Sequence, residues 1–158
     1  MEGMAGTAMT NTIAIVGKSR QVSQAELDKF STVYTVGTNP IEADMYLCLH
    51  GEKSKHPDRD VTWNDFEHVL REYRGTPLVN SICILMADIA YRREVLECFS
   101  GCVFILASPL ISKREYMYER AGVAYWVGYL SALGVTVFWE GGWQRSITMP
   151  YMYTGRLD

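Results

Sequence analysis

The chain has 158 residues and a formal net charge of -3, and 48% of its residues are apolar. This length fits one domain with a substantial core, and the composition is that of a globular protein. The lack of a basic block argues against a broad nucleic-acid surface, and no apolar run approaches the roughly 20 residues of a membrane span. We therefore expect neither a membrane nor extended nucleic acid as a partner.

Residues 1–11 are small and polar, and they predict a flexible N-terminus before a single domain over residues 12–158. This start lacks the charged beginning and apolar core of a secretory signal, which favours a cytoplasmic location. Apolar runs then predict strands, and apolar side chains at three- and four-residue spacing predict helices. The expected strands cover 12–16, 32–37, 45–49, 103–107 and 135–139; the expected helices start near 23, 62, 82 and 119, and a charged surface loop covers 52–60.

The segment 102–139 has the strand, helix, strand order of a parallel crossover unit. Within it, Ala124, Gly128 and Ala132 recur every four residues and predict a stripe of small side chains, on which the helix lies close to the sheet. The order of all elements predicts an α/β fold, a three-layer Rossmann-like sandwich of about five mainly parallel strands flanked by helices. Ligands of such sheets bind beyond the carboxyl ends of the strands.

That sheet edge selects the candidate ligand-binding residues. Gly17, Ser19 and Arg20 follow the first strand with Lys18 among them, where exposed amides and the Ser, Lys and Arg donors suit a phosphate. Asn39 follows the second strand, where it would read the sugar or base of a nucleotide. The structural alternatives are a plain tight turn at 17–20 and a turn residue before Pro40.

Four more residues join this set, each with a structural alternative. Asn80 and Ser81 precede a helix, where they either cap it or help to receive an anion. Ser108 follows the central strand and either lines the cleft or simply ends the strand. Arg120 stands beside Glu119 at the start of the last helix, where it either offsets a phosphate charge or forms a solvated ion pair.

The sequence names no catalytic residue and no metal site. The three histidines stand beside no recognised nucleophile pattern, and no pair of carboxylates suitable for acid–base chemistry stands out. The four cysteines lie in apolar segments without Cys-x-x-Cys spacing, so buried reduced thiols are expected. They are Cys48, Cys83, Cys98 and Cys102. The alternative is a zinc site from Cys98, Cys102 and a histidine, which lacks paired-ligand spacing.

Residues 13–19, Asn39 and residues 44–50 resemble the start of the MptE-like Rossmann proteins found in many phage genomes. Residues 80–87 resemble the start of a helix in these proteins, and residues 118–129 resemble their last helix. The resemblance implies a phage-encoded protein that binds a nucleotide or a nucleotide sugar, with Gly17, Ser19, Asn39, Asn80 and Ser81 around the ligand. Family members often end the central strand in Gly-x-Asp, whereas this chain has Ala107-Ser108-Pro109 and lacks that carboxylate.

Residues 122–134 also resemble the Gly-Thr-Ala-Phe-Glu-Ile-Gly helix of nucleoside 2-deoxyribosyltransferases. The Glu of that motif is the nucleophile, and Trp126 stands at its position in this chain. An indole cannot attack an anomeric carbon. This weaker resemblance therefore implies a related fold without deoxyribosyltransferase activity.

Together these features predict a protein that binds a nucleotide or nucleotide-linked small molecule, with group transfer as the reaction if it is an enzyme. The alternative is a non-catalytic virion component or interaction module, which acts as a homo-oligomer or with other virion proteins. In that alternative, subunit contacts come from the helical aromatic residues Tyr118, Tyr125, Trp126 and Tyr129 and from the tail between Trp143 and Tyr153.

Overall fold

The computed structural model describes residues 11–108, 110 and 116–141, without the side chains of residues 116–118. Asn11 already belongs to the first strand, so the predicted N-terminal segment is one residue too long. Residues 1–10, the side chain of Tyr118 and the aromatic tail from Trp143 to Tyr153 lie outside the described residues. The predictions made for them stay predictions.

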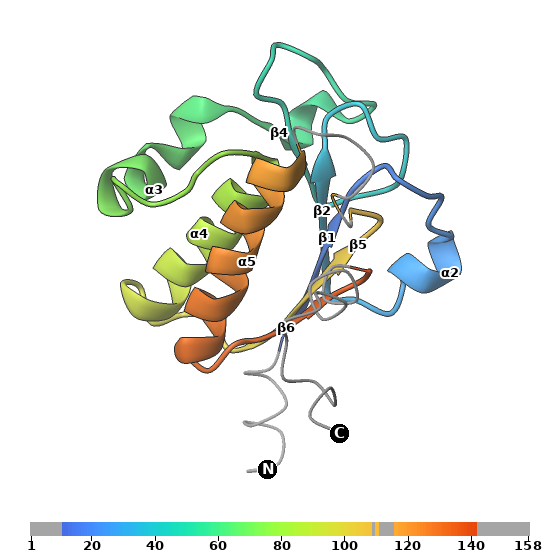
Figure 1. The fold of residues 1–158 in the computed structure, drawn as a ribbon. Coiled ribbons are helices and arrows are strands. Elements are labelled where there is room, and N and C mark those ends of the chain that lie inside the picture. Colours follow the sequence, from blue (N-terminus) through green and yellow to red (C-terminus); the bar gives the residue numbers. More distant parts are fainter. Residues whose placement is uncertain (1–10, 109, 111–115, 142–158) are drawn as a thin grey trace, which may run out of the picture.

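One parallel sheet of six strands forms the centre of the described part of the chain (Figure 1). Its strand order is β4-β3-β2-β1-β5-β6, and every neighbouring pair is parallel. This confirms the predicted α/β sandwich, with one strand more than the five expected. The strands are β1 (Asn11–Val16), β2 (Thr32–Val36), β3 (Met45–Leu47), β4 (Asp60–Val61), β5 (Gly101–Leu106) and β6 (Thr136–Trp139).

Helices cover both faces of the sheet (Figure 1). On one face, α4 (Ser81–Glu94) and α5 (Tyr116–Ala132) lie side by side, with α3 (Glu67–Glu72) beyond them. On the opposite face lies the single-turn helix α2 (Gln24–Leu27), which is capped by the Ser23 side chain. Two short 3-10 turns complete the described elements: η1 (Pro57–Arg59) and η2 (Trp63–Phe66). The sandwich therefore has a thick helical layer on one side and a thin one on the other.

The sheet is buried from both sides where β1 crosses the middle of the molecule. Ile13 and Ile15 belong to the larger apolar cluster beneath α3, α4 and α5. Ala14 and Val16 belong to the smaller cluster beneath α2. Burial on both faces explains why β1 has a continuous apolar run rather than an alternating pattern.

Helix α5 reaches the core through large side chains, among them Val123 and Leu130, which the sequence also placed on its buried face. The buried side chains include Val123, Trp126 and Leu130, whereas Gly128 and Ala132 are exposed. The predicted stripe of small residues is therefore wrong. The close approach in α5 is at Gly122, where an added Cβ would lie 2.8 Å from Val79 Cγ2 and 3.2 Å from Cys83 Sγ near the start of α4.

The strand order reverses direction between β1 and β5, and this reversal selects the edge of the sheet at which a site is sought. From β1 the chain continues through α2 to β2, whereas from β5 it continues through α5, on the opposite face, to β6 (Figure 1). The carboxyl ends of both strands meet at the same edge because the pair is parallel. This point is where doubly wound sheets bind ligands.

The pairing of β1 with β5 predicts opposite effects of one substitution at two glycines. Gly101 has φ of 154°, and an added Cβ would lie only 1.9 Å from the Asn11 carbonyl oxygen. Gly128 is helical, with nothing near its missing Cβ. Gly101→Ala should lower the free energy of unfolding by more than about 2 kcal/mol, whereas Gly128→Ala should raise it by about 0.5–1 kcal/mol. Denaturant unfolding measures both changes. Similar small effects at both positions would contradict this account of the central pair.

Candidate functional site

Two adjoining cavities lie at the carboxyl ends of the central strands, and we call them together the cleft. The larger has a volume of about 640 Å³ and the smaller about 200 Å³. They share Val16, Gly17 and Lys18, so the loop after β1 forms the wall between them. The larger cavity extends toward the start of α2 and residues 39–41, and the smaller toward the starts of α4 and α5.

The cleft brings together six of the eight residues selected from the sequence. Gly17, Arg20 and Asn39 line the larger cavity. Gly17 also lines the smaller cavity, together with Asn80, Ser81 and Ser108. Ser19 and Arg120 line neither cavity.

The backbone of the loop after β1 is bonded to the chain that leaves β5. The Gly17 N–H donates to the Leu106 carbonyl at 2.8 Å, and the Ser19 N–H donates to the Ala107 carbonyl at 2.9 Å. A Cβ on Gly17 would lie 2.5 Å from the Ala107 oxygen. The expectation that these two amides hold a phosphate is therefore not met by the hydrogen bonding: Gly17 permits two loops to approach each other, and both N–H groups have protein acceptors.

Asn39 braces the ends of β1 and β2. Its side chain is buried, with 7% of the residue exposed. Its Nδ2 donates to the Gly17 carbonyl and to Thr35 Oγ1, both at 2.9 Å, and Thr35 Oγ1 donates to the Val16 carbonyl at 2.7 Å. Asn39 thus lines the larger cavity while its amide N–H groups hold the wall of that cavity in place.

Arg20 is held by two carboxylates. Its Nε and one terminal nitrogen bind Glu140 at 2.9 and 2.7 Å, and that terminal nitrogen also binds Glu26 at 2.7 Å. Glu140 also accepts the Ala107 N–H at 2.9 Å. The hydrogen bonds from Arg20 hold the pKa of the Glu140 carboxyl below its ordinary value. Arg20 was predicted to offset the charge of a ligand. Its charge is instead balanced by Glu140 and Glu26, and these ion pairs join α2, β6 and the end of β5.

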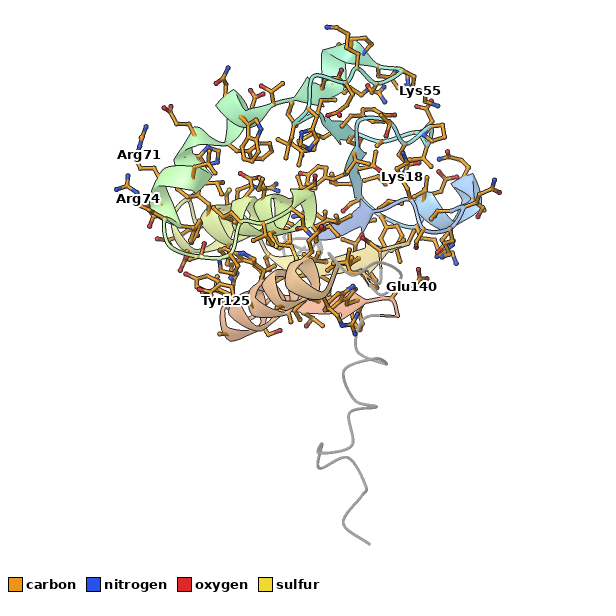
Figure 2. The ribbon with its side chains drawn as sticks, turned by 45° about the horizontal axis from the view of Figure 1, so that its top comes forward. Lys18, Lys55, Arg71, Arg74, Tyr125 and Glu140 are labelled. Atoms are coloured by element: carbon orange, nitrogen blue, oxygen red, sulfur yellow. The ribbon has the colours of Figure 1, made fainter. Side chains whose placement is uncertain are left out.

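Lys18 was named in the sequence as a phosphate donor of this loop but was not among the eight selected residues. It lines both cavities, and its Nζ donates to the Thr38 hydroxyl at 2.8 Å. It forms no ion pair with another described residue. Figure 2 shows Lys18 and Glu140 on the side of the molecule that carries α2, away from Tyr125 on α5. The signal for Lys18 was its place between Gly17 and Ser19 in the first loop.

The start of α4 forms the far wall of the smaller cavity. Asn80 is the N-cap, as predicted: its Oδ1 accepts the Cys83 N–H at 2.9 Å, and its Nδ2 donates to Glu119 Oε1 at 3.1 Å. Ser81 is the first helical residue rather than a cap. The N–H groups in the first turn of a helix lack partners within the helix. In α4 this first turn lies at the smaller cavity.

The last two predicted residues lie at β6 and at the end of β5. Ser108 lines the smaller cavity, and its carbonyl accepts the Trp139 indole N–H at 2.9 Å. The guanidinium of Arg120 lies over the Trp139 ring, 5.1 Å from the ring centroid. Arg120 thus packs on an aromatic ring at the sheet edge instead of lining the cleft.

The cysteines and Trp126 take structural positions. Cys48 and Cys83 are buried as predicted, and burial raises the pKa of the Cys83 thiol to about 11. Cys98 is exposed and Cys102 half-buried, which corrects the prediction for those two. Among the described residues, no three His, Cys, Asp or Glu side chains form a group that would hold a metal ion. Trp126 is fully buried and donates its indole N–H to the Pro77 carbonyl at 2.8 Å.

Searches against protein-family models, curated proteins and solved structures find no match for this chain. The two family resemblances seen in the sequence therefore stay predictions. None of the helices in the described ranges has the length and apolar character required to cross a membrane.

The Arg20–Glu140 pair predicts a pH-dependent contribution to stability. Because the pKa of Glu140 is lowered in the folded state, its contribution is present above about pH 4.3, the unfolded value, and is lost as the pH falls through the folded pKa. Glu140→Gln should lower the free energy of unfolding by about 1 kcal/mol at pH 7, since the pair is partly exposed. Chemical denaturation should show this difference shrinking between about pH 5 and 3.

Glu67→Gln is the matched control for that measurement. Glu67 pairs with Arg71 at 3.5 Å on an exposed stretch of α3, so its loss should change stability by less than about 0.5 kcal/mol. A loss at Glu140 that stays constant down to pH 3 would contradict the assigned pair.

Proposed function

We propose that this protein binds a nucleotide or a nucleotide-linked small molecule in the cleft. The observation that carries the proposal is the meeting of two cavities around Lys18 at the point where the strand order reverses. Ligands of open parallel sheets bind at this point because loops from neighbouring strands diverge there to opposite faces. The combined size of the two cavities is in the range of sites for small organic ligands.

The lining of the cleft supports an anionic ligand with an organic body. Lys18 provides a positive charge that no described carboxylate neutralises. Ile82, Leu85 and Leu110 provide an apolar surface in the smaller cavity, and Pro40 and Ile41 do so in the larger. A phosphate beside Lys18 would leave apolar surface on either side for a sugar or a base.

The two family resemblances enter the proposal in different ways. Binding of a nucleotide-linked donor agrees with the resemblance to MptE-like phage proteins, and group transfer is the reaction class that such a donor would undergo. The resemblance to nucleoside 2-deoxyribosyltransferases does not extend to their reaction, because Trp126 replaces the nucleophilic Glu. Its indole is buried and bonded to the Pro77 carbonyl.

Thermal unfolding in the presence of nucleotides and nucleotide sugars tests this proposal. A ligand at 100 times its dissociation constant should stabilise the protein by about 2.7 kcal/mol. Lys18→Met should weaken the binding at least tenfold, since a charge-assisted hydrogen bond is lost. Lys53→Met, which removes an exposed lysine outside both cavities, should bind like the unmodified protein. Equal binding by both variants would place the ligand elsewhere.

A non-catalytic interaction module is the second candidate, and one aromatic surface favours it. The Phe104 and Phe138 rings stack at 4.6 Å, and Phe30 packs against Phe104 at 5.1 Å. Phe138 lies on the edge strand β6 with 50% of its surface exposed. Within the described part of the chain, α2 is the only helix on this face of the sheet, and an exposed aromatic cluster of this kind is typical of a contact surface.

Sedimentation velocity separates the two candidates. If the aromatic surface joins subunits, the protein should sediment as an oligomer, and Phe138→Ser should shift it to the monomer. Trp63→Ser, which removes another exposed aromatic side chain, should leave the oligomer intact. A monomeric protein that binds nucleotides would exclude self-association through Phe138.

A further inference from the structure

The smaller cavity contains a carboxylate whose role in a ligand site was not expected. Glu119, in the first turn of α5, lines this cavity together with Asn80, Ser81 and Ser108. Its Oε1 accepts a hydrogen bond from Asn80 Nδ2 at 3.1 Å. The sequence suggested only an ion pair with Arg120, whose guanidinium instead lies over the Trp139 ring.

Glu119 keeps hydrogen-bonding capacity for a ligand. An ionised carboxylate has two oxygens and about four acceptor positions, and the described residues provide one donor to it. It forms no ion pair with another described residue. Asn80 cannot turn away easily, since its Oδ1 is bound to the Cys83 N–H as the cap of α4. The carboxylate is therefore held in place, and the described residues leave most of its acceptor positions unfilled.

The cleft consequently has charges of opposite sign on separate elements. Lys18 comes from the loop after β1, and Glu119 comes from α5, and the two do not pair with each other although both line the smaller cavity. A phosphate beside Glu119 would meet like charge. A phosphate beside Lys18 would leave a neutral, hydrogen-bond-donating part of the ligand to occupy the space beside Glu119.

We propose that Glu119 binds the hydroxyl groups of a sugar whose phosphate lies at Lys18. This inference rests on the proposed function and adds to it the orientation of the bound ligand, with its phosphate at Lys18 and its sugar at Glu119. Asn80, Ser81 and Ser108 line the same small space, and hydroxyl and amide groups can supply both donors and acceptors for sugar hydroxyls. A volume of about 200 Å³ suits one sugar ring rather than a whole nucleotide.

Isothermal titration with ribose 5-phosphate and with propyl phosphate tests the assignment, because the two probes share a phosphate monoester and differ in hydroxyl groups. The full chain should bind ribose 5-phosphate at least tenfold more tightly than propyl phosphate. Glu119→Gln should reduce this ratio to about threefold or less while the affinity for propyl phosphate stays the same or increases. Glu119→Asp, which keeps the charge, should retain more of the preference than Gln.

Glu72→Gln, at an exposed position outside the cleft, serves as the matched control and should keep the full preference. Gln at position 119 can still accept the Asn80 hydrogen bond, so both variants are expected to fold, and circular dichroism checks this. An unchanged preference in Glu119→Gln would overturn the role of Glu119 and leave the proposed function standing. Failure of the unmodified protein to bind either probe would overturn both.

Discussion

The geometry of the cleft depends on the close approach of the two chain segments that leave β1 and β5. The Gly17 and Ser19 N–H groups donate to the carbonyls of Leu106 and Ala107, so hydrogen bonding between the central strands continues beyond their ends. Only a glycine fits at position 17, since a Cβ there would collide with the Ala107 oxygen. From this fixed point one segment turns toward α2 and the other toward α5, and the cleft is the space around the point where they part.

The same contact determines which positive charge a ligand can meet. Lys18 and Arg20 lie two residues apart in the loop after β1. Arg20 binds Glu140 and Glu26, and Glu140 also accepts a hydrogen bond from the Ala107 N–H. A guanidinium that is already bound to two carboxylates adds little net charge to the cavity that it lines. Lys18, bonded to a neutral hydroxyl, keeps its charge for a ligand. Arg20 therefore joins the segments around the cleft, and Lys18 provides the charge that the proposed ligand would meet.

The sequence predicted the elements whose burial leaves a local pattern. The apolar run 13–16 predicted a strand covered on both faces, and Asn80 indicated the start of a helix. The structure confirms both. The two-residue strand β4 was missed because it is too short to show a period. The predicted topology brought six of the eight candidate residues to the cleft, but their bonding depends largely on partners distant in sequence. Arg20 and Glu140 are 120 residues apart, so the sequence around Arg20 does not reveal this pair.

Helix α5 contributes to the cleft through its first turn, and Trp126 explains why. The buried indole is bonded to the Pro77 carbonyl and packs edge-on against Tyr73, with ring centroids 5.2 Å apart. This fixes the middle of α5 to the segment just before α4, so that the starts of the two helices come together and Asn80 meets Glu119. A carboxylate in place of Trp126 would be buried among apolar side chains, where its charged form is costly. With Trp126, the middle of α5 therefore has no carboxylate nucleophile. The packing of the same indole positions the carboxylate of Glu119 at the start of the helix.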